Sequence, residues 1–132
     1  MSEDELRKLA YEMSFYRSQA AEMERQNGMV QQLLEENAAT AKALESLPEI
    51  SKDTMFSVGS GVFIKGKATD EKHVLVEIGS RIIAEKTVAE ARHLLEEKKR
   101  ELSKAAAELG ASFAAVNKRM AEIEERAAEL QK

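Results

Sequence analysis

The sequence predicts an α+β protein: a long antiparallel α-helical coiled-coil hairpin with a central insert of two β-hairpins. Two observations predict this fold class. Apolar residues recur with a heptad period toward both ends of the 132-residue chain, which is typical of paired helices. Four short β-rich runs, separated by turn-forming residues, lie between them. The chain therefore divides into an N-terminal coiled-coil helix over residues 1–47, a β-hairpin oligomerisation insert over 48–86 and a C-terminal coiled-coil helix over 87–132.

The first helix carries a continuous stripe at alternating spacings of three and four. Its members are Leu6, Leu9, Met13, Tyr16, Ala20, Met23, Asn27, Val30, Leu34, Asn37, Ala41 and Leu44. Because this stripe is narrow, it needs a second helix as partner, and its two asparagines are expected to fix the register. Ser2 and Glu5 form a capping-box pattern at the start. Leu47-Pro48 predicts the end, because proline lacks an amide hydrogen and disfavours a helical residue before it.

The last helix repeats this pattern. Six residues are spaced seven apart: Leu95, Leu102, Leu109, Val116, Ile123 and Leu130. Companion positions are held by Ala106, Phe113, Met120 and Ala127. Thr87 and Glu90 form a second capping-box pattern, which places the helix start near Val88. Two heptad helices joined by a compact insert are expected to pair antiparallel along these stripes.

The insert is predicted to hold four strands, over residues 56–58, 62–64, 74–78 and 81–84. Several runs are apolar at consecutive positions, so both faces of each hairpin need burial. The chain has no further segment to cover them, and isolated hairpins with open edges are marginally stable. We therefore expect other subunits to cover them. The residues expected to mediate oligomerisation are Val58, Val62, Phe63, Ile64, Val74, Val76, Ile78, Ile82 and Ile83.

Composition argues against several other classes of function. Charged residues form 33% of the chain and give a formal charge of −4, which disfavours nucleic acid or an anionic membrane as partner. The acidic N-terminus does not resemble a signal peptide, and there is no cysteine, so we expect a cytoplasmic protein without cofactor or metal. Gly59-Ser60-Gly61 precedes a strand and lacks the ending of a phosphate-binding loop. No catalytic constellation is visible, so the chain is not expected to be an enzyme.

Three motifs carry a resemblance to a known family. They are Val58-Gly59-Ser60-Gly61-Val62-Phe63-Ile64-Lys65, Val74-Leu75-Val76-Glu77-Ile78-Gly79-Ser80, and Ala84-Glu85-Lys86-Thr87 followed by Glu90-Ala91. With them the whole chain resembles the alpha subunits of archaeal-type prefoldin. The two hairpins match the alpha class, since the beta class has one. Arg81 departs from the family pattern, which usually has a second small residue in that turn.

The resemblance implies an ATP-independent chaperone, a holdase subunit of a heterohexameric prefoldin complex. The implied partners are prefoldin beta subunits, with two alpha and four beta chains, unfolded client proteins, and a group II chaperonin that receives the clients. Prefoldins of this kind capture non-native proteins at the tips of their coiled coils, which are the free helix ends. A different class of function, a structural coiled-coil tether or scaffold without chaperone activity, stays open on the residues alone.

Two aromatic residues stand out near the free helix ends. Tyr11 and Phe15 are four apart on one helical face and outside the stripe, so they are expected to be exposed. Single exposed apolar residues are common on protein surfaces, but this position favours client contact. Stripe residues nearby are expected to fray and add adaptable apolar surface. The predicted client-binding residues are Leu6, Leu9, Tyr11, Met13, Phe15, Ile123 and Leu130.

Overall fold

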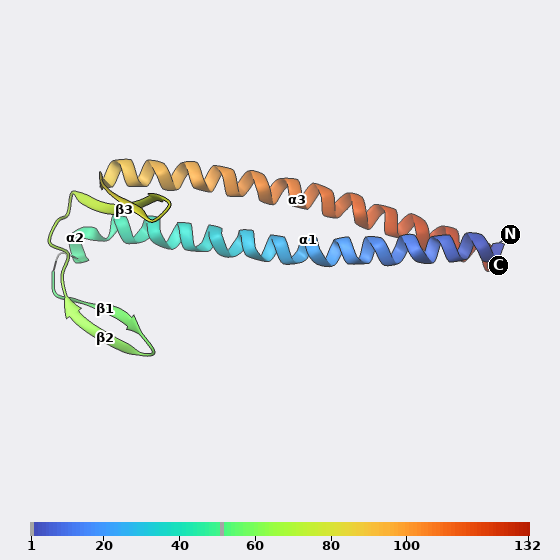
Figure 1. Cartoon of the computed structure of the whole chain (residues 1–132), viewed down its shortest axis with the longest axis horizontal. Coiled ribbons are helices and arrows are strands. Elements are labelled where there is room, and N and C mark those ends of the chain that lie inside the picture. The colour runs from blue at the N-terminus through green and yellow to red at the C-terminus, as the bar shows by residue number, and fades with distance from the viewer. Residues whose placement is uncertain (1, 51) are drawn as a thin grey trace. The chain divides into compact units, whose positions relative to one another are not determined.

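The computed structural model describes residues 2–50 and 52–132, and its element order confirms the predicted fold class (Figure 1). The elements are α1 (Ser2–Glu45), α2 (Leu47–Ile50), β1 (Thr54–Gly59), β2 (Val62–Gly66), β3 (His73–Gly79), β4 (Ile82–Thr87) and α3 (Val88–Leu130). The chain forms two compact units. Unit 1 consists of Met1–Leu33 and Leu102–Lys132, and unit 2 of Leu34–Glu101.

Unit 1 is an antiparallel pair of helical segments, in which the first part of α1 lies beside the last part of α3 (Figure 1). Ion pairs between Glu12 and Arg119 and between Glu5 and Arg126 establish the antiparallel direction. The predicted stripes face each other: within this unit all their members are buried or half-buried except Asn27. The most buried are Met13, Leu102, Val116 and Ile123. The heptad pattern therefore identified the core of this unit residue by residue.

Unit 2 combines the remaining helical segments with the two hairpins. Ala91 and Leu47 are its buried apolar residues among those described. Asn37 lies on the stripe and donates a hydrogen bond from Nδ2 to the carbonyl oxygen of Leu95, at 3.1 Å. This bond joins one position of α1 to one position of α3, as expected of a polar stripe residue that fixes register. Asn27 makes no comparable contact within the described residues, so a register role for it stays a prediction.

The end of α1 differs from the sequence prediction. The helix ends at Glu45, and the chain turns at Ser46, whose amide donates to the carbonyls of Lys42 and Ala43. α1 thus ends two residues before the predicted boundary at residue 47, and Pro48 lies at the second residue of the new helix α2. First-turn amides have no acceptor inside their own helix, so proline is tolerated there. At the other end, α1 already includes Ser2, so Ser2 is not the residue before the helix that a capping box requires.

The capping box at the start of α3 is confirmed. The Thr87 amide donates to Oε1 of Glu90 at 3.0 Å, and the Glu90 amide donates to Oγ1 of Thr87 at 3.1 Å. The helix begins at Val88, as predicted. The bond from the Thr87 amide is the main cause of a lowered pKa of the Glu90 carboxyl. The box thus satisfies two amides that the helix itself leaves without acceptors.

We expect acidification to weaken this helix start. Because the pKa of Glu90 is lowered in the folded chain, its stabilising contribution is present above the ordinary glutamate pKa and is lost as pH falls through the lowered value. Hydrogen-exchange protection of the Thr87 amide should therefore decrease in acid. Glu90→Gln keeps an acceptor oxygen but does not titrate, so it should flatten the pH profile. Identical profiles for the two proteins would contradict this assignment.

The strands form two separate antiparallel hairpins, β1–β2 and β3–β4. Phe56 pairs with Ile64 in the first hairpin and Val76 with Ala84 in the second. Each has a register irregularity just before its turn, and the two turns share one backbone pattern. Positive φ angles occur at Gly59 (108°), Ser60 (51°), Gly61 (78°), Gly79 (126°), Ser80 (47°) and Arg81 (64°). Arg81, predicted to open a strand, is therefore a turn residue.

Gly61 and Arg81 are the third residues with positive φ in their turns. Exchanging their residue types should have opposite effects on the stability of the two hairpins. Positive φ costs a residue with a Cβ roughly 1 kcal/mol relative to glycine. Arg81→Gly should therefore stabilise the β3–β4 hairpin by about 1 kcal/mol, and Gly61→Arg should destabilise β1–β2 by a similar amount. Hydrogen-exchange protection of the paired strand amides reports both changes. A loss of protection in the Arg81→Gly protein would show that the arginine makes a stabilising contact that outweighs its strain.

Candidate interaction surfaces

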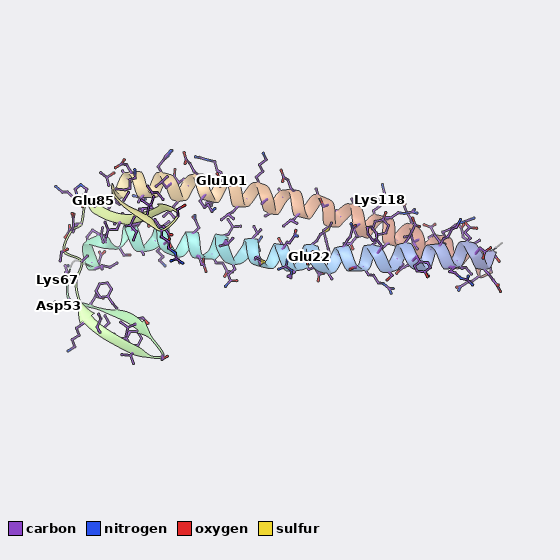
Figure 2. The ribbon with its side chains drawn as sticks, viewed as in Figure 1. Glu22, Asp53, Lys67, Glu85, Glu101 and Lys118 are labelled. Carbon is purple, nitrogen blue, oxygen red and sulfur yellow. The ribbon has the colours of Figure 1, made fainter. Side chains whose placement is uncertain are left out.

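The hairpins present most of their apolar side chains to solvent. Figure 2 shows side chains projecting from these strands. Seven residues predicted for oligomerisation have exposed fractions of 54% to 64%: Val58, Val62, Phe63, Ile64, Ile78, Ile82 and Ile83. The other two, Val74 and Val76, are half-buried. Large apolar patches are rare on monomeric proteins and mark interaction sites, so the gathering of exposed apolar residues on these strands indicates a surface for partners.

The β1–β2 hairpin is apolar on both faces. Phe56 and Ile64 are paired on one face, and the Phe56 ring lies against Gly66, where an added Cβ would be 3.3 Å from ring carbons. The opposite face carries Met55, which is paired with Lys65, and Phe63, which is paired with Ser57. Met55 and Phe56 are exposed and were missing from the predicted set. Phe56 belongs to one of the apolar runs that predicted the strands. Including every apolar residue of those runs would have added it to the predicted set.

The two faces of the β3–β4 hairpin differ. One face holds Val74, Val76 and Ala84, which are half-buried. The other face carries Leu75 and Ile83, with exposed fractions of 73% and 64%. Leu75 was also missing from the predicted set, although it lies inside the apolar run that predicted the strand. The face that carries Leu75 and Ile83 therefore offers the larger exposed apolar surface.

Near the free ends, the two aromatic residues predicted to be exposed are exposed. Tyr11 has an exposed fraction of 74% and Phe15 of 59%. The ring of Phe15 meets that of Tyr16 edge-on, with centroids 5.5 Å apart. The stripe residues proposed beside them are packed instead: Met13 and Ile123 are buried, and Leu6, Leu9 and Leu130 are half-buried. Client binding by any of the seven residues stays a prediction.

Two ion clusters lie beside the stripe at this end, and sequence analysis did not identify them. Arg119 contacts Glu12 at 3.0 Å and Glu122 at 3.3 Å. Arg126 repeats the arrangement one heptad later, with Glu5 at 3.0 Å and Glu129 at 3.3 Å. Hydrogen bonds to the carboxylates, Glu12 and Glu5 first, raise the pKa of each guanidinium. Each arginine thus joins α1 to α3 while it also pairs along its own helix.

Neither histidine belongs to a metal-ligand set. His73 Nδ1 lies 3.1 Å from Asp70, and His93 Nε2 lies 2.9 Å from Glu97. Across residues 2–50 and 52–132, no three potential ligands gather in a geometry that would hold a metal ion. The same part of the chain has no helix that is both long and apolar enough to cross a membrane.

These features define a class of protein: a helical hairpin whose inserted β-hairpins expose apolar residues. Comparisons with known proteins identify the family. A family model for prefoldin subunits matches residues 16–132. "Prefoldin subunit alpha" of Methanococcoides burtonii is 32% identical, covering 91% of this chain and 88% of that protein. The chain belongs to the prefoldin family, a family of chaperone subunits, which confirms the resemblance seen in the sequence.

Further comparisons agree with this assignment. "Prefoldin subunit alpha" of Pyrococcus horikoshii is 28% identical, covering 97% of this chain and 88% of that protein. A solved structure described as filamentous PFD from Methanocaldococcus jannaschii superposes with a TM-score of 0.74 at 23% identity. The match covers 90% of this chain and 98% of that one. This chain and that protein therefore share their overall fold.

Proposed function

We propose that this chain is an ATP-independent holdase subunit of a heterohexameric prefoldin complex. It assembles through its β-hairpins and captures non-native proteins near the free helix ends. The observation that carries this proposal is that two kinds of exposed apolar surface belong to different units: the strands to unit 2, and Tyr11 and Phe15 to unit 1. Partner subunits can therefore cover the strands while Tyr11 and Phe15 stay exposed for clients.

The proposed partners in assembly are beta-class prefoldin subunits, with two alpha and four beta chains per complex. Support comes from the curated relatives, which are named prefoldin subunit alpha, and from the hairpins themselves. Their apolar residues lie on both faces, and each two-stranded sheet has edges open to further pairing. Sheets contributed by other subunits satisfy both requirements, because they bury apolar faces and pair open edges. The division into residues 1–47, 48–86 and 87–132 is part of this proposal.

The proposed clients are unfolded proteins, which expose apolar groups in no fixed arrangement. Exposed aromatic residues such as Tyr11 and Phe15 contribute large contact areas, and several weak contacts from different subunits combine through their high effective concentration. Binding of this kind needs no nucleotide and no catalytic group. Delivery of the client to a group II chaperonin completes the proposed role and rests on family membership.

Suppression of client aggregation by the assembled complex tests the proposal. The intact complex should suppress aggregation of a chemically denatured client at near-stoichiometric ratio, as measured by light scattering. Tyr11→Ser with Phe15→Ser should reduce this protection severalfold, because both side chains are exposed and contribute contact area instead of core packing.

The matched control removes two other exposed apolar residues from α1, Met29 and Leu33. Met29→Ser with Leu33→Ser should leave protection close to that of the intact complex. Equal loss in both double variants would show that exposed apolar surface anywhere on α1 contributes. A complex that assembles but never protects a client would favour the alternative function, a coiled-coil tether or scaffold.

A further inference from the structure

Unit 1 contains a small cleft between its two helical segments. Met23, Glu24 and Asn27 of α1 line it together with Leu109, Gly110 and Phe113 of α3. Its volume is about 160 Å³. The apolar floor comes from stripe residues, since Met23, Leu109 and Phe113 are all half-buried. No function assigned above uses this cleft.

Gly110 is the residue that leaves the cleft open. Glycine in a helix interior is unfavourable relative to alanine, so its presence needs a local reason. The usual reasons are absent here. A Cβ added at Gly110 would meet nothing within 4 Å, and the residue does not have a positive φ angle. Neither close packing nor backbone conformation therefore requires glycine, and its effect on the surface is the space that a side chain would fill.

Two polar groups at the rim of the cleft are available to a ligand. The Glu24 carboxylate is exposed and makes no ion pair or hydrogen bond within the described residues. Its neighbour Glu22, in contrast, is paired with Arg25. The Asn27 amide also has no hydrogen-bond partner in the described part of the chain. The cleft thus combines an unpaired negative charge and a free amide with an aromatic and aliphatic floor.

We propose that this cleft binds the side chain of a lysine from an extended polypeptide. A lysine side chain has a four-carbon apolar stem and a compact ammonium head, which match the floor and the rim respectively. The stem lies along Leu109 and Phe113, and the ammonium donates to the Glu24 carboxylate and the Asn27 carbonyl oxygen. This site is separate from the proposed Tyr11 and Phe15 contacts, and it does not depend on them.

Titration of the ¹⁵N-labelled full chain with acetyl-Gly-Lys-Gly-amide tests the proposal. The Gly110 amide resonance should shift and saturate at millimolar peptide. The same peptide with norleucine in place of lysine keeps the stem but lacks the charge, so it should bind about two- to fivefold more weakly, as expected for the loss of an exposed ion pair. Glu24→Gln removes the charge from the protein and should weaken lysine-peptide binding by a similar factor.

A matched pair of glycine substitutions controls for helix stability. Gly110→Leu fills the cleft and should abolish binding. Gly28→Leu makes the same change in α1 at a glycine that is also unobstructed but does not line the cleft, so it should leave binding unchanged. Circular dichroism checks that both variants remain helical, and in a Gly110→Leu protein that lost its helix the Glu24→Gln titration decides the outcome.

Three results would overturn the proposal. Equal binding of the lysine and norleucine peptides would show that charge plays no part. Undiminished binding in Gly110→Leu would place the peptide elsewhere. Saturable shifts with butylammonium but none with the lysine peptide would assign the cleft to free amines, and a polypeptide would no longer be its ligand.

Discussion

Replacing Val76 and Ile78 together with aspartate should prevent assembly of this chain with a beta-class prefoldin subunit. Both residues lie on β3, and Ile78 falls at the register irregularity between Glu77 and Gly79. Ile78 has an exposed fraction of 56% and Val76 is half-buried, so a partner sheet would bury both. Covering two unpaired carboxylates costs several kcal/mol. Multi-angle light scattering of the mixture should show separate subunits in place of a complex.

The control adds the same two charges elsewhere. Gln31→Asp with Gln32→Asp changes exposed positions of α1 and should leave the mass of the complex unchanged. Helix content measured by circular dichroism should be alike in both double variants, because neither changes the stripe. A Val76→Asp, Ile78→Asp protein that still forms a complex of normal mass would show that this part of the hairpin is not the interface.

Truncating Ile123 should destabilise the helical pair of unit 1 more than truncation of any exposed residue of that unit. Its exposed fraction is 2%, so Ile123→Ala removes buried apolar volume and leaves a cavity, at a cost of roughly 2 to 4 kcal/mol. Leu102→Ala, at an exposed fraction of 8%, should have a similar effect. Urea unfolding followed by circular dichroism measures the loss.

Leu33→Ala provides the comparison, because that side chain is 44% exposed. The free energy of unfolding of the Leu33→Ala protein should fall by less than about 1 kcal/mol, because this substitution removes less buried apolar area than Ile123→Ala does. Assembly should survive in all three variants, because the proposed interface lies in the hairpins. Equal destabilisation by Ile123→Ala and Leu33→Ala would mean that the stripe is not the core.

The paired helices were predictable from the sequence because heptad spacing connects the position of a residue directly to its burial. Asn27 was the one stripe residue that stays exposed, since a polar side chain can turn to solvent where an apolar one gains by packing. The same logic found Tyr11 and Phe15, which lie off the stripe and are exposed. The helix start at Val88 followed from the side chains of Thr87 and Glu90, whose hydrogen bonds are local.

Features that depend on local backbone geometry were predicted less well. Pro48 indicated a helix end, yet proline is equally compatible with the first turn of a new helix. Arg81 resembled a strand residue because sequence does not reveal that its φ angle is positive. The cleft beside Gly110 was missed because its residues come from both helices and meet only once the register is fixed. An asparagine on one stripe and a glycine beside the other, both of which line the cleft, are the signal for such a gap.

The cross-helix contacts also imply an order of folding. Glu45 and Arg92 are 47 residues apart in sequence, whereas Glu5 and Arg126 are 121 residues apart. Closing a chain loop costs more entropy as the loop lengthens, by about 0.6 kcal/mol for each doubling. Helix pairing should therefore zip from Glu45 and Arg92 toward Glu5 and Arg126. The contacts around Glu5 and Arg126 form last, so no later contact beyond them adds stability. The helical segment that carries Tyr11 and Phe15 should therefore be the first to separate during unfolding.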